Sequence, residues 1–221
     1  MKDQKIVLPG GAGLVGQNLV ACLRLKGYTD IVVIDKHQKN LEILKQVHPE
    51  ITTHCADLSV TSDWIKFFES ASTVVMLQAQ IGGNVHSQFI DNNVASTRLI
   101  IEEIIRNKIP NVVHISSSVV ESIAENFYTE TKTEQEKLVL GSGISCPILR
   151  PTLMFGWFDR KHLGWLSRFM RQVPVFPVPG NGQYMRQPLY VGDFCNVILS
   201  CIENNITSGI YNISGHEKID Y

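Results

Sequence analysis

The stretch Gly10-Gly11-Ala12-Gly13-Leu14-Val15-Gly16 decides the fold of this 221-residue chain. It follows a short apolar run, Lys5–Leu8, and leads into Leu14–Lys26, where apolar residues recur at helical spacing. Glycine at the first, fourth and seventh positions lets the backbone turn tightly, approach a phosphate and pack a helix against a strand. The N-terminus of that helix presents free N–H groups to phosphate oxygens. The pattern predicts a strand–turn–helix unit that holds a pyrophosphate.

Further apolar runs continue the same alternation of strands and helices. The expected strands are Asp30–Ile34, Ile51–His54, Thr73–Leu77, Val112–Ser116 and Ser145–Leu149, and the helices between them are Trp64–Ser70, Asn93–Asn107 and Tyr128–Leu140. Runs that are apolar almost throughout are typical of strands buried on both faces of a parallel sheet. We therefore expect an α/β fold with a doubly wound, Rossmann-like parallel sheet.

The composition changes after Arg150-Pro151, where proline and glycine become frequent. We place a dinucleotide-binding domain at residues 1–150. Residues 151–221 are expected to form a small, loop-rich substrate-binding part that is interleaved with the sheet. This part should contain one helix over Asp193–Asn204 and one strand over Ile210–Ile213.

Charge and composition exclude several classes of protein. The chain has 20 Lys and Arg against 21 Asp and Glu, which argues against binding to nucleic acid or an anionic membrane. No apolar run reaches the ~18 residues of a spanning helix, and the first strand starts too early for a signal peptide. The cysteines and histidines lack metal-binding or disulfide spacing. We expect a cytoplasmic protein without a bound metal.

Asp35 ends the second expected strand, where a carboxylate can accept hydrogen bonds from the adenosine ribose. NAD offers two hydroxyl groups there, whereas NADP places a phosphate there, which a carboxylate repels. Lys36 and His37 follow directly and could instead turn toward a 2′-phosphate. We expect NAD in preference to NADP. Asp57 and Leu58 after the third strand form either a turn or an adenine contact.

Ser116-Ser117-Ser118 ends the fifth expected strand, and Tyr128 and Lys132 follow at i and i+4 on one helix face. A nearby ammonium stabilises phenolate, so it should lower the pKa of Tyr128 and make this residue a general acid/base. A serine hydroxyl can hold the substrate oxygen. The same spacing also arises by chance on amphipathic helices. Its place after a serine-ended strand favours the catalytic interpretation.

These motifs occur in the order seen in the short-chain dehydrogenase/reductases. Asn93-Val94, Arg150-Pro151 and Arg186-Gln187-Pro188-Leu189-Tyr190-Val191-Gly192-Asp193 complete the pattern. The last two blocks resemble the extended branch, the NAD-dependent epimerase/dehydratase family, whose members modify nucleotide-activated sugars. The resemblance covers nearly the whole chain. It implies a Rossmann-like fold, NAD as cofactor and a nucleotide sugar as substrate.

The resemblance also implies a role for individual residues. Those implied to bind the cofactor are Gly10, Gly13, Leu14, Val15, Gly16, Asp35, Asp57, Leu58, Leu77, Ala79 and Lys132. Tyr128 matches the catalytic acid/base, Lys132 the nicotinamide-ribose ligand and Ser117 the catalytic hydroxyl, with Ser118 as its alternate. Residues expected at the substrate are Gln78, Ser118 and Arg186. Asn93 matches a structural asparagine, and Glu136 also fits the catalytic helix.

Several positions depart from the family pattern. Pro9 precedes the first glycine, where a hydroxyl side chain is usual, and Glu121 replaces a tyrosine. Gln78 and Gln80 replace small residues and are expected to enter the substrate site. The sequence stops at Tyr221, where family members continue, so we expect either a truncated chain or a reduced sugar site. These departures affect the substrate class more than the fold.

Three functions follow from this comparison. The first is an NAD(P)-dependent epimerase or 4-keto reductase of a nucleotide sugar. Dehydration is least expected, because Ser118-Val119 stands where dehydratases have an Asp-Glu pair. The second is a non-catalytic dinucleotide-binding regulator or assembly subunit; such relatives usually lose the tyrosine or the lysine, so the retention of both favours the enzyme. The third is an oxidoreductase of a small alcohol or ketone.

The resemblance further implies a homodimer. The helices Asn93–Asn107 and Tyr128–Leu140 would pair across a two-fold axis. Leu99, Ile100 and Ile104 are expected to supply apolar surface beyond the stripe that faces the sheet.

Overall fold

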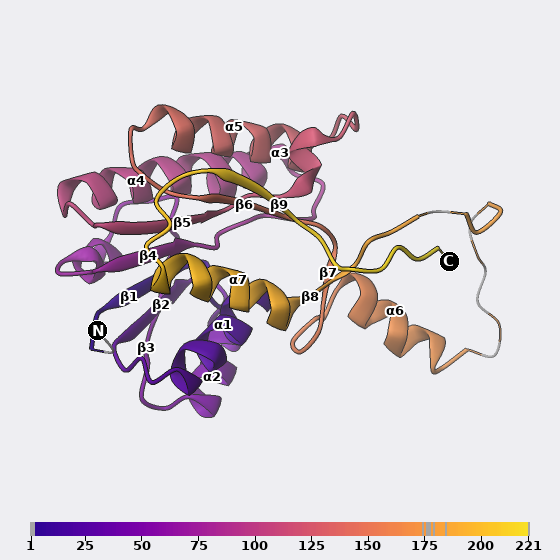
Figure 1. The fold of residues 1–221 in the computed structure, drawn as a ribbon, viewed down its shortest axis with the longest axis horizontal. Helices are drawn as coiled ribbons and strands as arrows, with labels where there is room; N and C mark the ends of the chain where they lie inside the picture. The colour runs from indigo at the N-terminus through magenta and orange to yellow at the C-terminus, as the bar shows by residue number, and fades with distance from the viewer. Residues whose placement is uncertain (1–2, 174, 176–177, 179, 184, 221) are drawn as a thin grey trace.

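The computed structural model describes residues 3–173, 175, 178, 180–183 and 185–220. Its centre is a seven-stranded sheet in the order β3-β2-β1-β4-β5-β6-β9, and every neighbouring pair is parallel (Figure 1). The strands are β1 (Ile6–Pro9), β2 (Ile31–Asp35), β3 (Thr52–Cys55), β4 (Thr73–Met76), β5 (Asn111–Ile115), β6 (Ile148–Pro151) and β9 (Ile210–Ile213). The predicted doubly wound, Rossmann-like α/β fold is confirmed.

Two apolar layers sandwich the sheet, one on each face. One face is covered by α1 (Leu14–Leu25), α2 (Gln38–Val47) and α7 (Val191–Glu203), and the other by the 3₁₀ helix η1 (Asp63–Phe68), α4 (Ser96–Arg106) and α5 (Phe127–Gly141). Because both faces are covered, the central strands have no solvated side, which explains their continuous apolar sequence.

The strand order reverses at β1, whose neighbours are β2 on one side and β4 on the other. In open sheets of this kind, a crevice forms outside the carboxyl ends of the strands at the point of reversal. The glycine turn directly follows β1, so the fold places it at this crevice.

The start of the sixth strand differs from the prediction. Ser145–Leu149 was expected, but β6 begins at Ile148. The amide of His114 donates to the carbonyl of Pro147, and the first amide donated by the strand is that of Ile148, to Gly209. Proline has no N–H, so the ladder of donated bonds can begin only after it.

The helix predicted over Asn93–Asn107 begins earlier and in a wider form. A short helix α3 (His86–Phe89) and a π-helical segment η2 (Ile90–Ala95) lead directly into α4. The hydroxyls of Ser96 and Thr97 donate to the carbonyls of Asn92 and Asn93, at 2.6 and 2.7 Å. Side chains that bond to preceding carbonyls compete with the regular ladder of an α-helix, which fits the wider turn here.

The C-terminal part contains elements that its proline and glycine content did not predict. The helix α6 (His162–Met170) and a short parallel pair, β7 (Met154–Phe155) with β8 (Leu189–Tyr190), follow β6. Figure 1 shows α6 extending away from the sheet. Asn18 donates to the carbonyl of Trp157 at 2.8 Å, and Arg160 donates to Asn40 at 2.9 Å. These bonds join the start of this part to α1 and α2.

Among the described residues, no helix has the length and apolarity that a membrane crossing requires.

Candidate active site

Gly10, Gly13 and Gly16 of the turn serve two different purposes. Gly10 has a φ of +76°, and a Cβ built on it would lie 2.4 Å from the Cα of Gln78. A Cβ on Gly16 would lie 2.1 Å from the carbonyl oxygen of Gly11. At Gly13, however, the nearest atom to such a Cβ would be 3.7 Å away. Gly10 and Gly16 therefore permit close packing, whereas Gly13 keeps space open at the N-terminus of α1, where a phosphate fits.

Asp35 is attached to the glycine turn. Its Oδ2 accepts a hydrogen bond from the backbone N–H of Ala12 at 3.0 Å, and its Oδ1 lies 3.0 Å from the backbone nitrogen of His37 and 2.9 Å from its ring Nδ1. Burial disfavours the ionised form, but the hydrogen bonds from His37 and Ala12 outweigh it and lower the pKa of Asp35. An ionised acceptor therefore lies at the end of β2, as the ribose-ligand prediction requires.

Asn93 links the segment after β4 to the catalytic helix. Its side chain accepts the backbone N–H of Gln80 at 2.6 Å and donates to the hydroxyl of Thr131 at 2.9 Å. Asn93 is fully buried, so these bonds form away from competing water. This geometry agrees with the structural role that the resemblance implied.

Gln78 does not face the substrate space as expected. Its side chain is buried and donates to the hydroxyl of Thr97 at 3.0 Å, beneath α4. Gln135 of α5 donates to the same hydroxyl at 2.7 Å. An amide this deep requires polar partners, and Thr97 supplies one for each glutamine. Gln78 is therefore a buried residue that links the end of β4 to α4. This corrects its assignment as a substrate ligand.

Ser117 and Tyr128 influence one another through their side chains. Contact with Ser117 lowers the pKa of the Tyr128 hydroxyl, against the larger effect of burial. Ser117 is buried at the end of β5, and it also caps the 3₁₀ helix η3 (Ser118–Glu121). The structure thus pairs Ser117, rather than its alternate Ser118, with the tyrosine.

The pKa of Tyr128 differs from our expectation. Burial raises it, and the bond with Ser117 offsets only part of that rise. We expected Lys132 to lower this pKa. Among the described contacts, however, the ammonium of Lys132 is directed to other partners. It donates to the carbonyl of Ile115 at 2.9 Å and to the side-chain oxygen of Gln135. Tyr128 is therefore protonated at neutral pH in this state.

Lys132 is itself strongly perturbed. It is 1% exposed, and burial lowers its pKa from 10.5 to about 7, despite the opposing charge of Glu136. His114 on β5 lies beneath the same helix, and burial followed by the nearby Lys132 charge holds the pKa of His114 well below its usual value. A lysine with a pKa near neutral can switch between ammonium and amine within the physiological range.

This lysine predicts an unusual dependence of stability on pH. In the unfolded chain it keeps its proton up to about pH 10.4, so between neutral pH and that point the unfolded state holds more protons than the folded state. The free energy of unfolding should therefore rise with pH, by up to about 1.4 kcal/mol per unit from this group. Urea titrations from about pH 7 to about pH 8.5 measure the slope.

Lys132→Met should remove this contribution, while Lys137→Met, at an exposed position of the same helix, should keep it. Other titrating groups are common to both variants, so the difference between their slopes isolates Lys132. Equal slopes in the two variants would show that Lys132 keeps its charge throughout.

A second polar network joins α5 to β6, η3 and β9. Glu136 accepts a hydrogen bond from Ser116 at 2.5 Å and forms an ion pair with Arg150 of β6. Arg150 also contacts Glu121 at 2.6 Å, and Asn212 of β9 donates to Glu121 at 3.2 Å. The sequence analysis treated Glu121 only as a departure from the family and did not detect this network, because its members are far apart in the chain.

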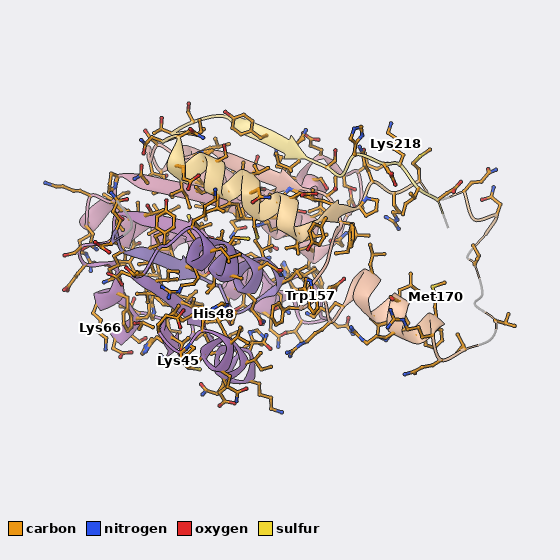
Figure 2. All side chains as sticks on the ribbon, turned by 60° about the horizontal axis from the view of Figure 1, so that its bottom comes forward. Lys45, His48, Lys66, Trp157, Met170 and Lys218 are labelled. Atoms are coloured by element: carbon orange, nitrogen blue, oxygen red, sulfur yellow. The ribbon has the colours of Figure 1, made fainter. Side chains whose placement is uncertain are left out.

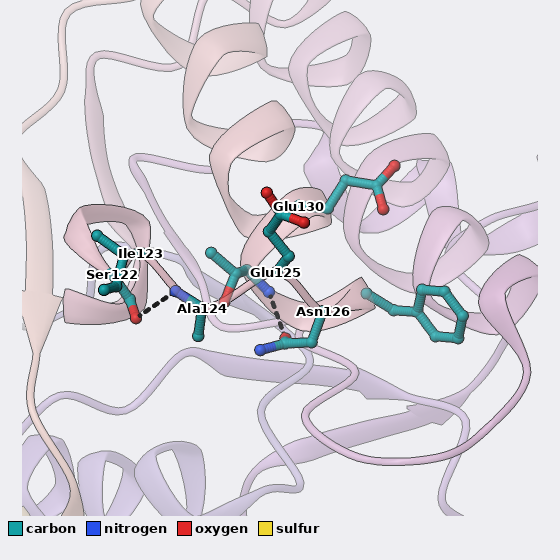
Figure 3. A pocket seen from close by; sticks show the side chains of 8 residues that line it. Ser122, Ile123, Ala124, Glu125, Asn126 and Glu130 are labelled. Atoms are coloured by element: carbon teal, nitrogen blue, oxygen red, sulfur yellow. Dashed lines mark hydrogen bonds between the residues drawn. The ribbon is translucent and has the colours of Figure 1, made fainter.

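The loop before α5 borders an open hollow of about 650 Å³. Figure 3 shows the turn closed by Ser122 and Ala124, and the start of α5, where Asn126 accepts the backbone N–H of Thr129. Tyr128 lies in the chain between Phe127 and Thr129, which both line the hollow. Sequence reasoning missed the loop, because its residues match no motif.

The remaining predicted residues lie in varied settings. Asp57 is exposed and accepts two hydrogen bonds from Ser59, which is the turn alternative, and Leu58 is buried in the core. Ala79 is exposed. Arg186 pairs through its backbone with Ile219 in the C-terminal part. Leu14, Val15 and Leu77 are half-buried and pack against the apolar layer on the α1 side.

The predicted catalytic and cofactor positions are nevertheless continuous in space. Gly10 abuts Gln78, the backbone carbonyl of Gln78 accepts a hydrogen bond from Gln135 at 3.5 Å, and Gln135 contacts Lys132. These contacts connect the glycine turn to α5 at the carboxyl ends of β1, β4 and β5.

This fold and site define a Rossmann-type protein of the extended short-chain dehydrogenase/reductase class. A sequence profile of the NAD dependent epimerase/dehydratase family matches residues 6–214. The chain belongs to this family.

Individual relatives are distant. NADH dehydrogenase (ubiquinone) 1 alpha subcomplex subunit 9, mitochondrial, of Dictyostelium discoideum is 26% identical over 212 residues, which are 94% of this chain and 58% of that protein. The N-acetyl-alpha-D-glucosaminyl-diphospho-ditrans,octacis-undecaprenol 4-epimerase of Escherichia coli O157:H7 is 25% identical and covers 95% and 67% of the two chains. This chain thus spans little more than half of the Dictyostelium protein.

Among solved structures, a UDP-glucuronic acid 4-epimerase from Bacillus cereus in complex with NAD superposes with a TM-score of 0.84. Its identity is 23%, over 98% of this chain and 80% of the other. At this identity the match supports the fold alone.

Proposed function

We propose that this protein is an NAD-dependent enzyme that acts on a nucleotide-activated sugar as an epimerase or a 4-keto reductase. The observation that carries the proposal is the half-buried Tyr128 with the buried Ser117 and Lys132 beside it, together with a glycine turn that leaves open space at Gly13. The family match and the Escherichia coli 4-epimerase relative support the same class of reaction.

The residues present fit NAD. The first turn of α1 and the space at Gly13 would hold the pyrophosphate, and the Asp35 carboxylate would accept the adenosine ribose hydroxyls. Lys132 would exchange its internal partners for the nicotinamide ribose. When bound, NAD supplies hydride exchange with the sugar carbon.

The chain's own residues would handle the proton. Tyr128 carries a proton at neutral pH, so it can donate to a sugar oxygen directly, and Ser117 orients that oxygen. To accept a proton, Tyr128 must ionise, and the ammonium of Lys132 would stabilise the phenolate if it left the Ile115 carbonyl. Residues 151–221, with Arg186 and Ser118, are proposed to contact the nucleotide sugar.

A thermal-shift screen of NAD, NADP and a panel of nucleotide sugars tests this function. A ligand that binds only the folded state raises the melting temperature, so we expect NAD to produce a shift that exceeds the shift with NADP near pH 8. Gly13→Val is the matched control, because its Cβ would enter the space proposed for phosphate and lie 3.7 Å from the carbonyl oxygen of Gly10, an ordinary contact. The proposal fails if NAD produces no shift in the wild type.

A second candidate is a dinucleotide-binding subunit without chemistry of its own. The Dictyostelium relative, a subunit of NADH dehydrogenase, favours it. The resting contacts of Lys132 with Ile115 and Gln135, rather than with Tyr128, also agree with it. The two candidates differ in one outcome: the subunit would bind NAD but would not turn over any nucleotide sugar. Retention of both Tyr128 and Lys132 makes the enzyme our first choice.

Homodimerisation through α4 and α5 remains a prediction, but its apolar residues need correction. Ile100 and Ile104 are buried in the core and cannot contact a partner, whereas Ile105 and Leu140 are 53% and 57% exposed. Light scattering at micromolar concentration should give twice the chain mass of 24.8 kDa. Ile105→Lys should shift the species toward monomer, and a monomeric wild type would contradict the prediction.

A further inference from the structure

The adenosine end of the crevice contains a histidine that the proposed chemistry does not use. His37 lies two residues after the end of β2 and directly precedes the first residue of α2. Its ring Nδ1 lies 2.9 Å from Oδ1 of Asp35, the expected ribose ligand, and its backbone N–H bonds to the same oxygen. The side chain of His37 is 65% exposed and that of Asp35 is 10% exposed. The histidine therefore remains open to solvent and ligand while it contacts a nearly buried carboxylate.

The protonation of this pair decides the charge at the ribose. A carboxylate only accepts hydrogen bonds, so Nδ1 donates to Asp35 and Nε2 is the nitrogen that gains or loses a proton. With neutral His37, the pair carries one negative charge, which repels a 2′-phosphate. With protonated His37, the pair has no net charge and an added N–H donor at Nε2. A 2′-phosphate would therefore be attracted when His37 is protonated and repelled when His37 is neutral.

We propose that His37 sets the selectivity between NAD and NADP as a titrating group, so that the site prefers NAD at alkaline pH and loses much of that preference at acid pH. The inference rests on the proposed function, because it requires a dinucleotide in this crevice. It adds a specificity-determining residue that discriminates by its charge state.

The neighbouring charges are consistent with this role. The charged groups that influence His37 are Asp35, adjacent in β2; Lys36, next in the chain; and Lys161, which precedes α6. The hydrogen bond to Asp35 raises the pKa of His37, burial opposes this, and the two lysines oppose it further. The net effect is a raised pKa for His37. The two lysines add positive charge that attracts a phosphate.

Lys36 in particular does not take the place of His37. Its ammonium donates to the side-chain oxygen of Asn92 at 2.5 Å, across the crevice on η2. It is therefore a fixed cation held by a different element. Lys36 and His37 therefore contribute separately to the attraction of a 2′-phosphate, and the proposed pH dependence comes from His37.

The test is a titration of the wild type with NAD and with NADP between about pH 5.5 and about pH 8.5. The ratio of the NADP and NAD dissociation constants should fall by at least about tenfold toward acid pH, since uptake of one proton allows up to tenfold per unit. In His37→Gln the fall should be much smaller. The 2′-phosphate itself titrates near about pH 6, but equally for both proteins, so their difference isolates His37.

His48→Gln is the matched control. His48, which is labelled in Figure 2, is the C-cap residue of α2, so the 10 residues of this helix separate it from His37. This variant should keep the wild-type pH dependence, and Lys36→Gln should weaken NADP binding without changing the slope. His37→Gln should fold normally, because the bonds of Asp35 to the backbone of Ala12 and residue 37 are retained.

A second measurement needs no variant. By linkage, a ligand whose binding takes up a proton must raise the pKa of the group that binds it. NADP should therefore raise the imidazole pKa of His37, followed by NMR, more than NAD does. Equal slopes in wild type and His37→Gln, or equal pKa values with the two ligands, would overturn the inference. If NAD binds near pH 8.5 and the slope is absent, only this inference fails; if neither dinucleotide binds, the proposed function fails with it.

Discussion

Tyr128→Phe is expected to lower turnover by at least about 100-fold, the scale of general acid/base catalysis, while NAD affinity stays almost unchanged. The substitution removes only the hydroxyl that is bonded to Ser117, and the ring still fills its buried place. Turnover is measured with the nucleotide sugar that the thermal-shift screen identifies, and NAD affinity by titration calorimetry.

Tyr211→Phe is the matched control for this change. Its hydroxyl bonds to the carbonyl of Ser208 on the exposed edge strand β9, so its loss should leave turnover near the wild-type value. Wild-type turnover in Tyr128→Phe would contradict the proposed mechanism. Loss of NAD binding in this variant would instead indicate a structural role for the hydroxyl.

Arg150→Met should lower the free energy of unfolding by about 3–5 kcal/mol, because it leaves the carboxylate of Glu136 buried without its cation. The side chain of Glu136 is 7% exposed and that of Arg150 is 17% exposed, so water cannot fully replace the lost partner. Glu121 loses the same cation but is half-exposed, and its loss should matter less. Urea denaturation near pH 7 measures the change.

The pair Arg150→Met with Glu136→Leu separates loss of an ion pair from loss of packing. Replacing both charges with apolar groups is often close to neutral, so the double variant should recover much of the stability. The deficit of the single variant should also shrink in acid, where Glu136 becomes protonated. In the wild type, Arg150 and Ser116 lower the pKa of Glu136 although burial opposes them. A double variant as unstable as the single one would contradict this account.

The sequence alone was sufficient to predict the fold class. It was also sufficient for residues whose conformation is set by their neighbours in the chain. The glycine turn requires a positive φ at Gly10 and close approach at Gly16, and only glycine meets both demands. The continuous apolar runs required strands covered on both faces. The prediction that Ser117 and Tyr128 act together rests on a serine-ended strand and a helix start, both of which are short-range patterns.

The tertiary structure decided where the polar side chains point. Gln78 and Lys132 occur at the predicted positions in the chain, yet both turn inward, because Thr97, Gln135 and the Ile115 carbonyl offer them partners inside the protein. With Lys132 turned inward, burial is left to raise the pKa of Tyr128. A sequence pattern places residues along a strand or helix, but the direction of a buried polar side chain depends on partners from distant segments. Desolvation makes those partners obligatory.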